Sequence, residues 1–187
     1  MTNNNNNLIS MILNLGAFKA NIINVEELQF DVKFRAMCES NACGNYGKCW
    51  TCPPDAGDIK DLINELSAYK YALVYQTVGE LEDSYDFETM MEVGTQHNRL
   101  TQKVRELFSE NGMENSLHLG AGGCRICDIC AKKTNEQCRY PELALKSLEA
   151  YGINVSKLAE TAKMKYINGQ NTVTYFGAAF FNEDNNG

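Results

Sequence analysis

Hydrophobic residues follow two different spacings along this chain, and together they predict a fold in which strands and helices alternate. Short apolar and β-branched runs suit strands at residues 17–25, 71–78, 117–119 and 172–181. Apolar positions three and four apart predict helices at residues 59–66, 87–108, 141–148 and 156–166. Asp55 or Asp58 is a candidate cap for the first helix, and Asn111-Gly112 is a typical end for the long one.

The order of these elements predicts a mixed α/β fold. A strand, a long helix and a second strand in succession favour two parallel neighbours with a right-handed connection. The expected fold is therefore a single mixed, partly parallel sheet with packed helices and two cysteine-rich metal-binding loops. A single domain over residues 17–182 is expected, with flexible segments at residues 1–16, which contain an asparagine run, and 183–187.

The net charge limits the classes of partner that the protein is expected to bind, and the lengths of its apolar runs indicate its compartment. A formal net charge of −7 disfavours binding to nucleic acids and to anionic membranes. No apolar run reaches the length of a membrane span, and the first residues lack the pattern of a signal peptide. We therefore expect a cytoplasmic protein, in which thiols stay reduced and a high cysteine count indicates metal binding or catalysis rather than disulfides.

Eight cysteines fall into two groups of four, and the second group carries the stronger signal. Its members are Cys124, Cys127, Cys130 and Cys138. Three thiols spaced two residues apart can wrap three corners of a [4Fe–4S] cube, and a nearby segment supplies the fourth. Zinc is the alternative, although it prefers two separate Cys-x2-Cys pairs.

The first group is more loosely spaced, and its spacing fits more than one kind of site. Its members are Cys38, Cys43, Cys49 and Cys52. A cysteine followed directly by proline occurs in bacterial ferredoxins, where that cysteine ligates the other cluster, so the groups could exchange ligands. Cys49 and Cys52 could instead form half a zinc site or a redox dithiol, with Trp50 shielding the metal from water.

Several other residues near the cysteines are candidates for supporting roles. Cations at Arg35, Lys48, Arg125 and Arg139 would offset the negative charge of thiolate-bound clusters, or are ordinary surface charges. The glycines at positions 120, 122 and 123 would let backbone N–H groups approach cluster sulfurs, or only form a turn. His97 and His118 are expected to be packed or solvated rather than coordinating, and Tyr46 to be structural.

The residues around both groups resemble a bacterial and archaeal family of predicted metal-binding proteins built on a domain of unknown function. The resemblance rests on residues 43–54, 122–130, 138–141 and 147–153, and it covers about residues 19–180. It implies Cys38, Cys43 and Cys52 as the shared ligands of the first group, because the position of Cys49 is commonly asparagine in the family. A site with three cysteines would leave one iron of a cluster open.

These observations favour three functions. The first is a cytoplasmic protein with one or two [4Fe–4S] clusters that transfers electrons to a redox partner protein. The second is an enzyme whose open iron at the first group binds a small molecule or sulfide. The third is a zinc protein in which metal serves folding alone. The sequence names no substrate and predicts no oligomeric state.

Overall fold

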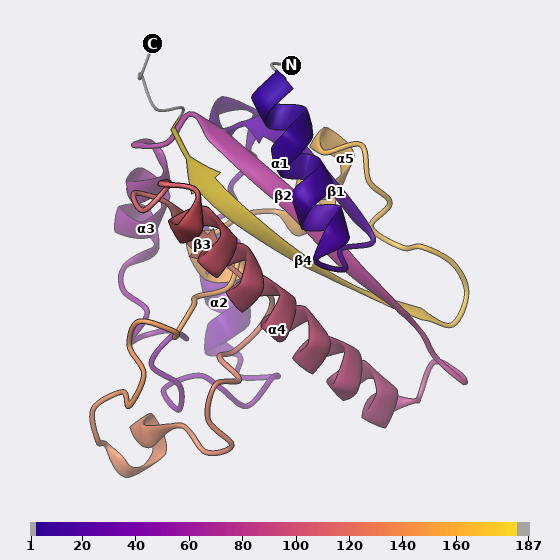
Figure 1. The fold of residues 1–187 in the computed structure, drawn as a ribbon. Coiled ribbons are helices and arrows are strands. Elements are labelled where there is room, and N and C mark those ends of the chain that lie inside the picture. The colour runs from indigo at the N-terminus through magenta and orange to yellow at the C-terminus, as the bar shows by residue number, and fades with distance from the viewer. Residues whose placement is uncertain (1–2, 183–187) are drawn as a thin grey trace.

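A four-stranded antiparallel sheet organises the molecule (Figure 1). The computed structural model describes residues 3–182. The strand order is β1-β2-β4-β3, and every neighbouring pair is antiparallel. The strands are β1 (Lys19–Asn24), β2 (Tyr71–Glu80), β3 (Leu117–Leu119) and β4 (Thr172–Phe181). All four strands lie where the sequence predicts them, although the bounds of β1 and β2 differ by one or two residues.

The predicted parallel pair is wrong. β2 and β3 do run in the same direction, because each is antiparallel to β4, but β4 lies between them. Its ten residues pair with the whole of β2, from Tyr71 opposite Phe181 to Glu80 opposite Thr172. A continuous ladder between two ten-residue strands satisfies far more backbone groups than the three residues of β3 can offer. The last strand of the chain therefore takes the central position.

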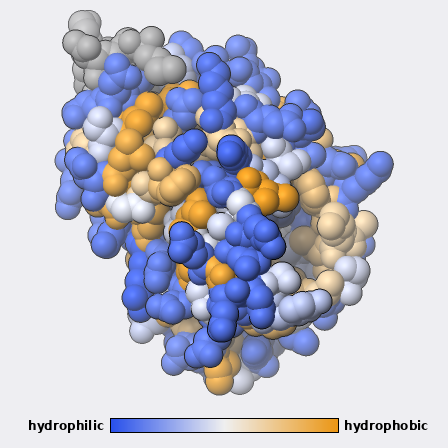
Figure 2. Space-filling view, turned by 90° about the vertical axis from the view of Figure 1, so that its right-hand side faces the viewer, coloured by the Kyte–Doolittle hydropathy of each residue, from blue (hydrophilic) through white to orange (hydrophobic). Residues whose placement is uncertain are grey.

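Helices cover both faces of the sheet (Figure 1). The helices are α1 (Asn3–Asn14), α2 (Lys33–Glu39), α3 (Ile59–Leu66), α4 (Phe87–Glu110) and α5 (Val155–Thr161), with 3-10 turns η1 (Val25–Glu27), η2 (Ala131–Thr134) and η3 (Glu149–Tyr151). α1 and α4 pack on one face, while α3, α5 and η3 pack on the other. Hydrophilic side chains predominate on the side of the molecule shown in Figure 2, with hydrophobic ones in small groups between them.

The two helices with the clearest pattern begin and end as predicted. The Asp58 carboxylate caps α3 by accepting the Lys60 N–H at 2.8 Å, and Asp86 caps α4 by accepting the Thr89 N–H at 3.1 Å. After α4, Gly112 adopts a positive φ of 76°, which reverses the chain at low steric cost.

Two predicted helices differ from the structure. Residues 141–148 form turns instead of a helix, because Gly120 engages their backbone: its N–H donates to Lys146 O, and its carbonyl accepts the Leu148 N–H. The last helix is also shorter than predicted. It begins after Asn154, which caps it, and ends at Thr161, before Lys163 with φ of 58°.

Residues 3–14 form α1, in the segment expected to be flexible. Leu8 and Ile12 lie one helical turn apart and are buried against the sheet. This burial stabilises a helix that the asparagine run alone would not support. Residues 183–187, also expected to be flexible, lie outside the described residues.

Candidate metal centre

Two irregular segments that lie far apart in the sequence meet beside the sheet (Figure 1). The first runs from α2, which carries Cys38, to the start of α3. It contains all four cysteines of the first group, and the second segment follows β3 and contains the four cysteines of the second group together with η2. Neither segment has a long regular element, so contacts between the two segments hold them in place.

Five of the eight thiols line one narrow cavity of about 20 Å³ between these segments. Its cysteines are Cys49, Cys124, Cys127, Cys130 and Cys138. All four cysteines of the second group are therefore together, and one member of the first group joins them. Within residues 3–182, no three His, Cys, Asp or Glu side chains lie close enough together to hold a single metal ion.

The other three thiols lie outside that cavity. Cys52 lies close to the glycine loop: a Cβ added at Gly123 would be 3.6 Å from its Sγ. Gly123 thus allows the second segment to approach the first closely. After the hydrogen bond to Cys49 and burial, the proximity of Cys43 and Cys38 adds to the effects that raise the pKa of Cys52, so these three thiols lie in one neighbourhood. Cys43 is exposed, whereas Cys38 and Cys52 are partly buried.

Cys49 lies at the junction of the two sets and is only 2% exposed. Its Sγ is 3.3 Å from the Thr51 hydroxyl, which in turn accepts the Cys124 N–H at 3.3 Å. A hydrogen bond from the Cys52 thiol lowers the pKa of Cys49 to about 5, helped by Thr51 and the Cys124 amide and opposed by burial. The same hydrogen bond, with burial, raises the pKa of Cys52.

Burial acts on two further thiols. It raises the pKa of Cys124 to about 11, and it raises the pKa of Cys38, although Arg35 opposes that shift. These thiols therefore carry their protons at neutral pH. A thiolate-binding metal must displace those protons, so metal uptake at this centre releases acid.

Side-chain contacts from Trp50 and Lys132 hold the two segments together. The Trp50 Nε1–H donates to the Glu136 carbonyl at 3.0 Å, and Lys132 Nζ lies 4.2 Å from the centre of the Trp50 ring. Lys132 also forms an ion pair with Asp55, and both side chains are less than one-fifth exposed. Trp50 forms part of the cavity wall, and its shielding of a metal stays a prediction.

The candidate cations have structural partners. Arg125 lies against Gly94 of α4 and donates to Met91 O at 3.3 Å. Arg139 donates to Ile129 O at 3.0 Å, and Arg35 donates to Gly57 O at 2.8 Å. Arg139 and Arg35 therefore hold the backbone of the cysteine segments, Arg125 ties the second segment to α4, and Lys48 is exposed.

Sequence reasoning missed Thr51, whose hydroxyl joins Cys49 to Cys124, and the Lys132–Asp55 ion pair. Their only sequence signal is proximity to cysteines. His97 and His118 are both buried and lie outside the cysteine cavity. Tyr46 is partly buried, and its amide N–H donates to Asn41 Oδ1 at 3.1 Å.

We expect the Trp50→Ala substitution to loosen η2 without unfolding the sheet. It removes a hydrogen bond and a cation–π contact, each worth about 1 kcal/mol. The amides of Lys133 and Asn135, which donate within this turn, should then exchange with solvent at least tenfold faster. Trp50→Phe, which keeps a ring under Lys132, should give a smaller increase. Unchanged exchange in both variants would show that Trp50 does not hold the turn.

One family model matches residues 21–181, and its description is "Predicted metal-binding protein (DUF2284)". The chain belongs to this family. The match includes all eight cysteines and the whole sheet except the first two residues of β1, and it confirms the resemblance found from the sequence. No curated protein and no solved structure matches the chain. None of the helices within residues 3–182 is both long and apolar enough to cross a membrane.

Membership makes this chain a predicted metal-binding protein. The family description names no metal and no reaction. In the structure of this chain, five thiols line one cavity and three lie beside it.

Proposed function

We propose that this protein holds a [4Fe–4S] cluster in its second cysteine segment and exchanges electrons with a redox partner protein in the cytoplasm. The observation that carries the proposal is the convergence of Cys124, Cys127, Cys130 and Cys138 on one cavity. Their spacing suits a cubane, and their chemistry suits iron, because soft thiolates are the ligands of iron–sulfur clusters.

The surroundings of the cavity support the same assignment. Trp50 and Tyr140 contribute aromatic surface to its wall, which limits the access of water to a bound group. Arg139 follows Cys138 in sequence and lines the same cavity, which brings positive charge close to the ligands. A bound cluster would supply one-electron oxidation and reduction, and nearby cations favour its reduced form.

The remaining thiols favour a second candidate function. Cys49 lines the cavity of the second group, which leaves Cys38, Cys43 and Cys52 as a set of three. Three cysteines around a cubane leave one iron without a protein thiolate. That site would bind a small molecule or sulfide, and the protein would then be an enzyme.

Purification without oxygen tests the main proposal. We expect brown protein with about four iron and four sulfide for each cluster, and visible absorbance that dithionite bleaches and air or ferricyanide restores. Colourless protein with near-stoichiometric zinc would instead support the third alternative, in which metal serves folding alone. Iron that dithionite does not reduce reversibly would contradict electron transfer.

Replacing Cys49 tests how the thiols are divided. We expect Cys49→Asn to leave the iron and sulfide content unchanged, because neither proposed site uses this thiol as a ligand. Cys52→Ser, a change of the neighbouring and hydrogen-bonded thiol, is the matched comparison and should lower the iron of the first site. Loss of iron in Cys49→Asn equal to that in Cys52→Ser would make Cys49 a ligand.

A further inference from the structure

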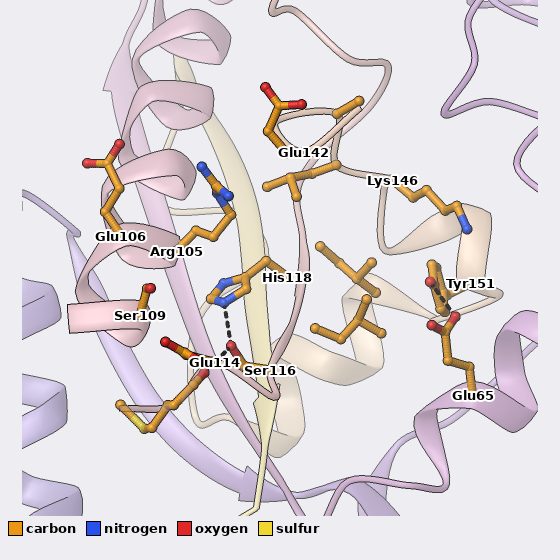
Figure 3. Close-up of a pocket in the computed structure, with 15 residues that line it drawn as sticks. Glu65, Arg105, Glu106, Ser109, Glu114, Ser116, His118, Glu142, Lys146 and Tyr151 are labelled. Atoms are coloured by element: carbon orange, nitrogen blue, oxygen red, sulfur yellow. Dashed lines mark hydrogen bonds between the residues drawn. The ribbon is translucent and has the colours of Figure 1, made fainter. Parts of the chain in front are cut away.

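A second and larger cavity, of about 650 Å³, lies along the outer edge of β3 (Figure 3). All three residues of β3 line it, between α4 on one side and residues 142–146 on the other. Glu65 and Tyr151 close its far end, where the Tyr151 hydroxyl donates to the Glu65 carboxylate at 2.7 Å. We call this cavity the β3-edge groove. Leu143 and Leu145, which line the small cavity next to Cys124, belong to the same wall segment.

The backbone of β3 presents unpaired groups to the groove. Gly120, just after β3, uses both its N–H and its carbonyl on the outer side, toward Lys146 and Leu148. The backbone N–H and C=O groups of successive residues in a strand point to opposite edges. Those of Leu119 therefore point toward β4, and those of His118 point away from it. No hydrogen bond within the described part of the chain occupies the outward N–H and carbonyl of His118. Residues 146–148 thus pair with the outer edge of the sheet at Gly120, whereas the residues before them diverge from β3.

One ring nitrogen of His118, Nδ1, has no hydrogen-bond donor beside it within residues 3–182. The Ser116 hydroxyl donates to the Met113 carbonyl at 2.8 Å, so its oxygen accepts from His118 Nε2–H at 2.9 Å (Figure 3). This arrangement leaves Nδ1 as an unprotonated acceptor. The residue is 5% exposed, and Nδ1 has no partner within residues 3–182. A buried acceptor without a donor is costly, and a ligand that supplies N–H groups would relieve that cost.

The charges around the groove are predominantly negative. Four carboxylates and two cations line it, and none of the six forms an ion pair with another described residue: Glu65, Glu106, Glu114, Glu142, Arg105 and Lys146. His118 adds no charge near pH 7, because burial lowers its pKa to about 4, assisted by Arg105. The groove therefore complements a ligand with more positive than negative groups.

We propose that the β3-edge groove binds an extended, lysine- or arginine-rich peptide segment of a partner protein, which adds as a strand beside β3. Strand addition would use the outward N–H and carbonyl of His118, as extended peptides do when they join an open sheet edge. Basic side chains of the peptide would lie toward Glu106 and Glu114 near α4 and toward Glu142 on the opposite wall. This binding does not depend on the metal centre.

A labelled peptide with free ends blocked and alternating lysine and valine tests the proposal on the full chain, by fluorescence anisotropy. We expect saturable binding that weakens between about threefold and tenfold in the double variant Glu114→Gln/Glu142→Gln, since each rim charge contributes modestly. Glu88→Gln, at the start of α4 and outside the groove, should bind as the unchanged protein does. Hydrogen exchange of the His118 amide should slow at least tenfold on saturation.

Two control peptides separate strand addition from attraction between charges. Methylation of alternate backbone nitrogens keeps every lysine but removes the N–H groups of one peptide edge, and should abolish protection of His118. A peptide with glutamate in place of lysine should not bind. The proposal would be overturned if the peptide bound the double variant as tightly as the unchanged protein and did not protect the His118 amide from exchange. A dimer whose His118 amide is already protected before peptide is added would overturn it too, because a second copy would then fill the groove.

Discussion

We expect Cys127→Ser to abolish binding of the proposed cluster in the second cysteine segment and to have the largest single-residue effect on iron and sulfide content. Cys127 is the middle thiol of the evenly spaced triplet and lines the shared cavity. A serine oxygen is a poor substitute, because it is a hard donor that stays protonated, whereas iron–sulfur clusters are held by soft thiolates. We expect about four iron and four sulfide per chain to be lost.

Cys43→Ser is the matched control for this experiment. Cys43 is exposed and lies outside the shared cavity, so its loss should leave the iron of the second segment in place. Iron, sulfide and zinc are measured on protein purified without oxygen, together with visible absorbance. Circular dichroism should show the same helix and strand content in both variants, because the two hydrophobic clusters of the sheet contain none of the cysteines. Retention of full iron in Cys127→Ser would refute a cluster in this segment.

The second cysteine segment could be proposed from sequence because its spacing is local. Cys124, Cys127 and Cys130 span seven residues, so a single turn of chain determines most of their arrangement. The place of Cys49 could not be predicted in this way. It depends on the Trp50–Glu136 hydrogen bond and the Lys132–Asp55 ion pair, whose partners are 86 and 77 residues apart in the chain. Such pairings are a property of the folded molecule and leave no periodic pattern.

The fold shows the same division between local and long-range information. Strands and capped helices could be predicted because side-chain alternation and capping depend on neighbouring residues. The order of the strands could not, since β4 enters the sheet between β2 and β3 from the far end of the chain. In α1, the spacing of Leu8 and Ile12 was an available signal that the asparagine run obscured. The groove beside β3 arises from the divergence of residues 142–146, which the sequence predicts as a helix.

Acidification should destabilise the metal-free protein strongly, and two buried histidines determine the pH range in which this happens. Burial lowers the pKa of His97 to about 4, opposed by the Phe176 carbonyl, and that of His118 also to about 4. In the unfolded chain both return to about 6.5. Between pH 6.5 and pH 4 the unfolded state therefore binds more protons than the folded state, so the free energy of unfolding falls as pH is lowered through this window.

The expected size of this effect makes it measurable by urea unfolding at pH 7.5, 6, 5 and 4. A pKa of about 4 against 6.5 corresponds to roughly 3 kcal/mol for each histidine, most of it lost by pH 4. Glu149 acts in the opposite direction, because burial raises its pKa and favours its neutral form in the folded state. Its contribution lies above the ordinary glutamate pKa of about 4.3.

The double variant His97→Gln/His118→Gln isolates the contribution of the two rings. It should be less stable than the unchanged protein at pH 7.5, because Thr77 and Ser116 lose well-placed ring partners. Its stability should nevertheless change much less between pH 6.5 and pH 4, since neither glutamine takes up a proton. Metal-free protein is required, because acid also releases thiolate-bound metal. If the double variant and the unchanged protein lose stability in parallel, the titrating groups lie elsewhere, and the histidines are not buried in the neutral form.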